Sequence, residues 1–216
     1  IQSQLASGWS DSFGVSNDIP QRQLNAAESN PGLIALACPK YMLPYYGGTV
    51  HLDGYGYRWL GEYCSRAYET MLLGKQWRPL SPRTIAFTSL LRDALVVDFW
   101  VPSAPLVIDT TLVSEPTGIP GQKYGFEVFD ASAQPPAITS ITPYGSSGTQ
   151  LMIQLSGPLE KGARLRYAYS LPNPGGTAGP GPPTGGCRGN LRDSDASVSL
   201  YGNTLYNWCV IFDKEI

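Results

Sequence analysis

Charge of either sign is scarce in this chain, and histidine is scarcer still. Charged residues make up 15% of the 216 residues, 15 of them basic and 17 acidic, and His51 is the single histidine. Proteins that bind nucleic acid usually carry a basic patch, and none is visible here. No apolar run is long enough for a membrane-spanning helix. The first twenty residues are polar and mixed, so we see no signal peptide.

Cysteine is also scarce, and its spacing argues against a metal site. The chain has four cysteines, and no two stand at the CxxC spacing of a structural zinc site. Cys38 and Cys64 lie in apolar segments, so we interpret them as buried free thiols. Cys187 and Cys209 could form a disulfide, but their spacing does not decide this. We predict no metal site and infer no oxidising compartment.

Glycine and proline, by contrast, are abundant. The 24 glycines and 19 prolines favour turns and loops over long helices. Aromatic residues are frequent too, with 13 tyrosines and five tryptophans. Such side chains either pack between β-sheets or line contact surfaces for sugars and proteins.

The first part of the chain, residues 1–75, has the pattern of an α/β unit. A helix is predicted over 21–29, where Asp18 can cap the start and the Asn-Pro-Gly sequence at 30–32 ends the helix. The unbroken apolar run at 33–38 then predicts a strand of a parallel sheet that is buried on both faces.

A second and longer helix is predicted over 54–73, with Asp53 as its cap and Gly74 at its end. Five apolar residues at helical spacing predict its buried face: Tyr57, Leu60, Cys64, Tyr68 and Met71. On another face Glu62 and Arg66, one turn apart, are expected to attract each other modestly.

From about residue 84 onward the pattern changes to short apolar runs separated by turn residues. The predicted strands are 94–101, 106–113, 124–129, 137–142, 150–155, 165–169 and 205–212. So many strands without a helix between them predict an all-β antiparallel sandwich. We therefore expect an α/β domain at 1–75, a linker at 76–83 and a β-sandwich accessory domain at 84–216. The Gly/Pro-rich segment 172–186 is predicted to be a loop without regular structure.

His51 lies in the loop between the predicted buried strand and the second helix. Imidazole is the usual general base for a serine nucleophile because its pKa lies near neutrality. Moreover, α/β proteins place their active sites in loops at the carboxyl ends of parallel strands. A lone histidine is nevertheless more often structural, so its position alone does not assign a role.

The local sequence His-Leu-Asp-Gly-Tyr-Gly-Tyr-Arg-Trp-Leu-Gly-Glu-Tyr, which begins at His51, resembles the last conserved block of SGNH (GDSL-like) hydrolases. The order of segments 25–39 and 41–46 is similar to the same family, so the resemblance spans about 17–75. It implies the C-terminal half of a three-layer α/β fold with a parallel sheet, in which His51 is catalytic. It also implies serine-type ester hydrolysis without a cofactor, with O-acetylated polysaccharide as the expected substrate.

Two departures from the family pattern bear on this prediction. Gly48 stands where the family has the aspartate that orients the imidazole, while Asp53 is better explained as a helix cap. The blocks that supply the serine and the oxyanion hole are absent. Ser10-Asp11-Ser12-Phe13 superficially resembles the nucleophile block, but we interpret it as a polar loop for two reasons. No strand is predicted before it, and only 38 residues separate Ser12 from His51, which leaves no room for the strands and helices that normally bring the two together. We expect the N-terminal half of the esterase, or a neighbouring subunit, to cover the strand at 33–38.

Three C-terminal segments carry a second resemblance: 164–169, 189–195 and 205–209. They are similar to SGNH proteins of bacteriophage tails, which implies a location in a virion tail or outside the cell and a homo-oligomer. Arg188, Asn190 and Arg192 offer hydrogen-bonding groups suited to sugars, or else form a polar turn that holds the last strand. Tyr46 and Trp77 are the aromatic residues predicted to contact substrate.

Three functions therefore stay open. The first is a carbohydrate esterase whose serine-bearing half is absent from this chain. The second is a non-catalytic accessory or structural module, which Gly48 favours. The third is a carbohydrate-binding β-sandwich with an unrelated N-terminal extension.

Overall fold

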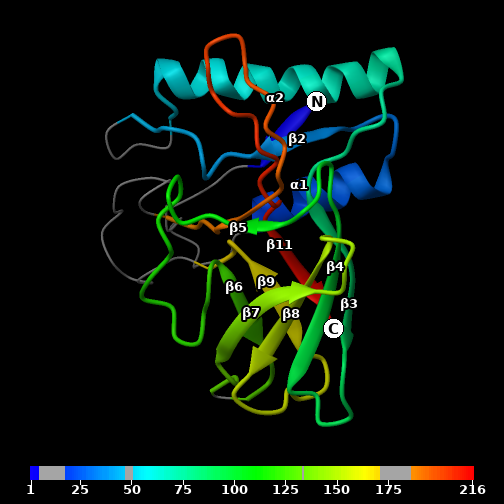
Figure 1. The fold of residues 1–216 in the computed structure, drawn as a ribbon, viewed down its shortest axis with the longest axis vertical. Helices are drawn as coiled ribbons and strands as arrows, with labels where there is room; N and C mark the ends of the chain where they lie inside the picture. The colour runs from blue at the N-terminus through cyan, green and yellow to red at the C-terminus, as the bar shows by residue number, and fades with distance from the viewer. Residues whose placement is uncertain (5–17, 47–50, 133, 171–185) are drawn as a thin grey trace.

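The computed structural model describes residues 1–4, 18–46, 51–132, 134–170 and 186–216. Two helices, α1 (Asp18–Ser29) and α2 (Gly54–Leu73), lie on opposite sides of a short parallel sheet (Figure 1). That sheet pairs β1 (Gln2–Gln4) with β2 (Leu36–Pro39). The mixed α/β character predicted for the N-terminal region is thus confirmed.

The predicted bounds of α2 are confirmed by both of its caps. The carboxylate of Asp53 accepts a hydrogen bond from the backbone N–H of Gly56 (2.6 Å). At the other end Gly74 adopts the left-handed conformation (φ +68°), which glycine reaches without steric cost.

The predicted buried face of α2 is wrong by one residue. Tyr57 and Tyr68 are exposed, and the buried residues of the helix are Gly56, Tyr63 and Ala67. Small residues on the inner face let the helix approach β2 closely, whereas the outer tyrosines keep their hydroxyl groups in water.

The strand predicted at 33–38 begins later than expected. Leu33 is exposed, and the strand covers Leu36–Pro39, all of it buried. The two helices and β1 provide this burial from within the chain, so cover by a second polypeptide stays a proposal. The cap predicted at Asp18 concerns a side chain outside the described residues.

Antiparallel strands form the rest of the structure, as predicted. One sheet has the order β3-β4-β8-β7: Ser81–Phe87, Ala94–Trp100, Gln150–Leu155 and Ile138–Tyr144. A second has the order β11-β9-β6: Phe212–Glu215, Arg164–Tyr167 and Phe126–Phe129. A short pair joins β5 (Val107–Ile108) to β10 (Leu191–Arg192). Alternate residues of the two larger sheets, such as Val97, Ile153 and Leu165, are buried in one core.

Several strand bounds were predicted incorrectly. The segment 205–212 contains only the first residue of β11, and 106–113 is a strand only at Val107–Ile108. Strand β3, which begins at Ser81 inside the predicted linker 76–83, was not foreseen as a strand. The predicted loop at 172–186 lies outside the described residues except for Gly186.

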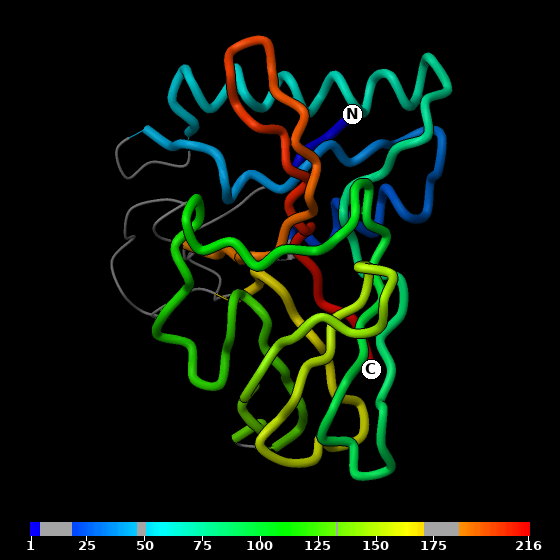
Figure 2. Tube along the Cα trace, in the orientation of Figure 1, coloured from blue at the N-terminus to red at the C-terminus, as the bar shows by residue number. Residues whose placement is uncertain are grey.

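The C-terminal segment connects the β-rich region to the α/β unit. Figure 2 shows it, orange to red, passing α2 and then descending to the C terminus. The side chain of Gln4 donates to the carbonyl of Ile211 (2.8 Å) and accepts from its N–H (2.7 Å). Tyr41 donates to the carbonyl of Cys209 (2.7 Å). The two regions therefore share one core, and the predicted domain boundaries stay a prediction.

Arg66 of α2 also reaches the C-terminal segment instead of pairing with Glu62 as predicted. Its guanidinium forms an ion pair with Asp195 (2.9 Å) and donates to the carbonyl of Leu205 (2.7 Å) and the side chain of Asn207 (2.9 Å). Long-range acceptors replace the local one because this face of α2 packs against 195–207.

All four cysteines are free, so Cys187 and Cys209 do not form a disulfide. Both are buried, and burial raises the pKa of the Cys187 thiol to about 12. Cys38 is buried as predicted, whereas Cys64 is only half-buried.

Candidate functional site

The loop that carries His51 follows the carboxyl end of β2. Its base is anchored by Tyr41, Met42 and Leu43, all buried. Further along, the N–H of Tyr46 donates to the carbonyl of His51 (3.0 Å), and Tyr45 and Leu52 form an antiparallel bridge. These contacts pair residues 45–46 with 51–52, a pairing that we call the hairpin, and the side chains of Tyr46 and His51 are exposed on it.

Gly56 ties this hairpin to the first turn of α2. A Cβ atom at this position would collide with the carbonyl oxygen of Pro44. The N–H of Asp53 donates to the same carbonyl (3.2 Å). The second glycine of the motif, Gly56, therefore lets the helix begin directly against the hairpin, which sets where His51 lies.

His51 itself is exposed, and so is Tyr46. The structure therefore brings these two predicted site residues together at the carboxyl edge of the parallel sheet, where α/β proteins bind ligands. Asp53 caps α2, as predicted, by accepting the hydrogen bond from the N–H of Gly56. Gly48 and the Ser10–Phe13 segment lie outside the described residues. Because β1 (Gln2–Gln4) precedes that segment, our argument that no strand does so is wrong.

An aromatic surface flanks the first turns of α2. The guanidinium of Arg58 lies over the ring of Tyr201 (4.0 Å to the centroid) and near that of Tyr55 (4.9 Å). Tyr55 donates to the side chain of Asn203. Tyr55 and Tyr201 are both partly exposed. This stack, formed between α2 and the loop 195–205, was not foreseen, because its members are far apart in sequence.

The structure places Arg188 and Asn190 in an irregular loop, as one of the two interpretations of these residues expected. Arg188 is buried and donates to the carbonyls of Ser114 (2.7 Å), Glu115 (3.1 Å) and Gly186 (3.0 Å). Asn190 is fully buried and donates to the carbonyls of Asp109 and Val113. Their donors stabilise an irregular loop, so the geometry favours a structural role, and sugar contact stays a prediction.

Arg192 belongs to the same network. It forms an ion pair with Asp109 (2.7 Å), and its guanidinium covers the ring of Tyr206 (3.6 Å to the centroid). Burial raises the pKa of the Asp109 carboxyl, but hydrogen bonds from Thr111 and Arg192 outweigh it, so the pKa lies below its usual value. An arginine held on two sides is better suited to fixing the loop than to meeting a ligand.

Trp77 lies near the opposite end of α2 from His51. The helix has 20 residues, so its ends are about 30 Å apart. Trp77 is half-buried, and its indole N–H donates to the side chain of Asn207 (3.1 Å). The structure therefore does not bring Trp77 together with His51 and Tyr46.

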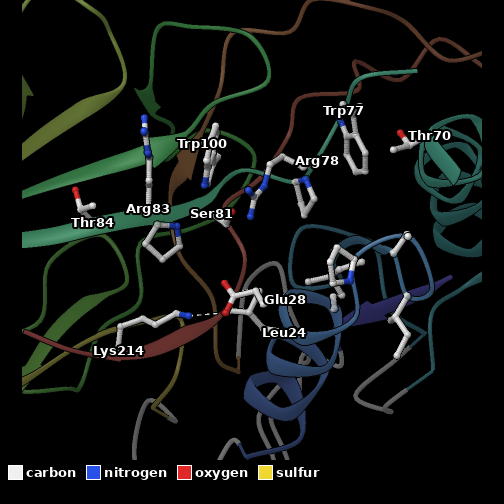
Figure 3. Close-up of a pocket in the computed structure, with 18 of the residues that line it drawn as sticks. Leu24, Glu28, Thr70, Trp77, Arg78, Ser81, Arg83, Thr84, Trp100 and Lys214 are labelled. Carbon is white, nitrogen blue, oxygen red and sulfur yellow. Dashed lines mark hydrogen bonds and ion pairs between the residues drawn. The ribbon is translucent and has the colours of Figure 1, made fainter. Parts of the chain in front are cut away.

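Instead, Trp77 lines a groove of about 710 Å³ (Figure 3). Its walls come from α1, the segment 31–36, the end of α2, the segment 77–79, β3 and β11. Leu24, Pro31 and Leu36 contribute to its apolar floor. No sequence signal indicated it, because it is assembled from elements that are distant in sequence.

Charged and aromatic side chains surround this groove. Trp100 lies between Arg78 and Arg83, whose guanidinium carbons are 4.6 Å and 4.7 Å from its ring centroids (Figure 3). On the facing wall Glu28 pairs with Lys214 (2.7 Å). The combination of a flat apolar floor and ionic rim is typical of small-molecule sites.

Within the described residues, no cluster of three or more histidine, cysteine or acidic side chains is arranged to hold a metal ion. Neither described helix combines the length and hydrophobicity needed to cross a bilayer.

The chain matches no protein-family model, and no curated protein is similar to it in sequence. Its fold is similar to the crystal structure of XAC1771, a novel carbohydrate acetylesterase from Xanthomonas citri. The TM-score is 0.57 at 13% identity, over 98% of this chain and 40% of the esterase. A weaker likeness joins 76% of this chain to 28% of the N-terminal part of the bacterial S-layer protein SbsC, with a TM-score of 0.34 and 12% identity. The likeness to the esterase lends no support to the predicted phage association.

Proposed function

We propose that this chain is the C-terminal part of a serine-type esterase that removes O-acetyl groups from carbohydrate, with His51 as general base. The observation that carries the proposal is the exposed position of His51 at the carboxyl edge of a parallel sheet, within a fold similar to that of a carbohydrate acetylesterase. In this role the imidazole takes the proton of a serine hydroxyl as its oxygen attacks the acetyl carbonyl, and returns it to the departing sugar oxygen.

The serine and the oxyanion hole would come from polypeptide outside this chain. The chain spans 40% of the length of the acetylesterase. Among the described residues the parallel sheet has two strands, β1 and β2, and parallel sheets this small are rarely stable alone. An N-terminal half, or a neighbouring subunit, that adds further strands would complete both sheet and active site.

Aromatic residues near His51 suit a carbohydrate substrate. Tyr46 is exposed beside it, Tyr55 lies on the first turn of α2, and Tyr201 of the loop 195–205 packs against Arg58 of that helix. Their rings can contact sugar C–H groups while their hydroxyls bond to sugar oxygens. Such substrates are met outside the cell, so we propose an extracellular location.

A non-catalytic accessory module is the second candidate. Gly48 replaces the usual orienting aspartate, and the carboxylate of Asp53 is occupied by the N–H of Gly56. In this role the chain would bind glycan without hydrolysing it.

Acetate release separates the two candidates. The protein would be purified in the form its source makes, with a denaturing mass spectrum to show which polypeptides it contains. With 4-nitrophenyl acetate and an acetylated xylo-oligosaccharide, we expect His51→Ala to lower kcat at least about a thousandfold. Lys161→Met replaces an exposed residue in a turn outside the proposed active site and should leave kcat unchanged. Equal kcat in wild type and His51→Ala would exclude the catalytic role.

A further inference from the structure

The groove beside Trp77 and Trp100 is lined by three cations and by the carboxylates of Glu28 and Glu215, and among the described residues one of these cations forms no ion pair. Arg83 has Asp98 as a partner (3.7 Å), and Lys214 has Glu28 (2.7 Å). Across the part of the chain that the structure describes, Arg78 has no ion-pair partner, and its contact is with the ring of Trp100. An anion that binds in the groove would supply a negatively charged partner for Arg78.

The position of Arg78 suits it to hold such an anion. In Figure 3 its guanidinium points into the groove, toward the wall that carries Glu28. Partial burial lowers the pKa of Arg78, and the carboxylate of Glu28 partly offsets this. Stacking on Trp100 fixes the guanidinium plane and leaves its N–H edge available for an in-plane, bidentate acceptor such as a carboxylate.

The remaining lining favours a sugar as the bearer of that carboxylate. A pyranose ring has apolar C–H faces and a rim of hydroxyl groups. Pro31, Pro79 and Pro82 line the groove and offer apolar contact, and Thr84 offers a hydroxyl partner, whereas the hydroxyl of Thr70 donates to the carbonyl of Arg66 (3.0 Å). The volume of about 710 Å³ lies within the range of small-ligand sites, roughly 300–1,000 Å³.

We propose that this groove binds a uronic-acid segment of an acidic polysaccharide, with Arg78 holding the sugar carboxylate. The choice of a glycan rests on the proposed function, while the choice of an acidic one rests on Arg78. The site lies near the opposite end of α2 from His51 and cannot share one sugar with it. It would hold the polysaccharide while another segment meets His51, which raises the local substrate concentration.

The test is calorimetric titration of the 216-residue chain with tetragalacturonic acid at low salt. We expect saturable binding that weakens as salt rises. Arg78→Gln removes the charge from an exposed side chain and should weaken binding about tenfold or more. The matched control is Arg22→Gln, an exposed arginine of α1 outside the groove, which removes the same charge and should bind as wild type.

Two further ligands test whether binding requires the carboxylate and whether it requires the sugar. The fully methyl-esterified tetrasaccharide should bind about tenfold more weakly than the acid, and tetraglutamate should bind no better than that ester. The proposal is overturned by equal affinity for acid and ester, by tetraglutamate binding as tightly as the uronic acid, or by an Arg78→Gln variant that binds normally.

The result of this binding experiment is independent of the result of the acetate-release experiment. His51→Ala should bind tetragalacturonic acid like wild type, because His51 is not among the groove residues. Binding without acetate release would contradict only the esterase. Acetate release without uronic-acid binding would contradict only the groove proposal.

Discussion

At its N-terminal end α2 begins against the hairpin that carries His51, and its C-terminal end lies at the groove that contains Arg78. The first end is built from neighbours in sequence: Asp53 caps the helix, and Gly56 contacts the carbonyl of Pro44. The second is built from α1, β3 and β11, which are distant in sequence. One helix thus positions two sites, the first through contacts between sequence neighbours and the second through contacts between residues far apart in sequence. The consequences of this difference can be tested along the helix.

Gly56→Ala should have the largest effect. The new Cβ would collide with a backbone carbonyl that cannot move without displacing the hairpin. We expect a loss of about 3 kcal/mol in the free energy of unfolding, measured by urea denaturation.

Gly61→Ala is the control for this change, since the same helix has open space at that position. An alanine there should leave stability unchanged or raise it by up to about 1 kcal/mol. Equal effects of the two changes on stability would mean that the contact with Pro44 does not require glycine at position 56.

Arg66→Met should have the next largest effect, because Arg66 joins the middle of α2 to the C-terminal segment. The change leaves the carboxylate of Asp195 and the carbonyl of Leu205 without their partner. We expect a loss of about 2–3 kcal/mol in thermal or urea unfolding.

Lys75→Met provides the comparison, since Lys75 forms an exposed ion pair with Glu69 at the end of the helix. Its loss should cost less than about 0.5 kcal/mol. Similar costs for the two variants would show that α2 is not held by its contact with 195–207.

The same difference between local and long-range contacts decides which of these features the sequence could predict. The bounds of α2 were predictable because a capping aspartate and a terminal glycine act within one turn. The hairpin position of His51 followed from the apolar run before it. The groove was not predictable, because nothing local to Arg78 or Trp100 indicates that Glu28 and Lys214 lie opposite them.

The polar residues near the C terminus show the other limit. Arg188 and Asn190 read as surface residues because their side chains are polar. In the fold they are buried, since their donors satisfy main-chain carbonyls of a loop that forms no regular ladder. Sequence periodicity carries no signal for such loops.

Removing either cap of α2 should lower the free energy of unfolding by a similar, smaller amount. Only the loss of the N-terminal cap should also disturb the hairpin. Asp53→Ala and Gly74→Ala should each cost about 1 kcal/mol, the first by losing the cap and the second by forcing alanine into a left-handed conformation. Asp53→Ala alone should also accelerate amide exchange at Tyr46, whose N–H bonds to His51. Accelerated exchange at Tyr46 in both variants would mean that the hairpin depends on the whole helix and not on its first turn.

The smallest effect should be a pH dependence at the contact between α2 and the C-terminal segment. Burial raises the pKa of the Asp195 carboxyl, but hydrogen bonds from Ser197 and the charge of Arg66 outweigh it, so the pKa lies below its usual value. The folded state therefore binds fewer protons than the unfolded state between the two pKa values, and stability falls as pH drops through that interval. In urea unfolding, Asp195→Asn should be less stable than wild type at neutral pH, and the difference should shrink below about pH 4.

The role of Arg66 in that dependence can be isolated by a double-mutant cycle. Because Arg66 is one cause of the lowered pKa, the pH dependence lost on Asp195→Asn should be smaller in an Arg66→Met background. The hydrogen bond from Ser197 remains there, so part of the dependence should persist. An unchanged dependence would assign the low pKa to the turn at 195–197 alone. The low pKa of Asp195 would then arise within the C-terminal segment itself, and α2 would contribute only the packing and hydrogen bonds of Arg66.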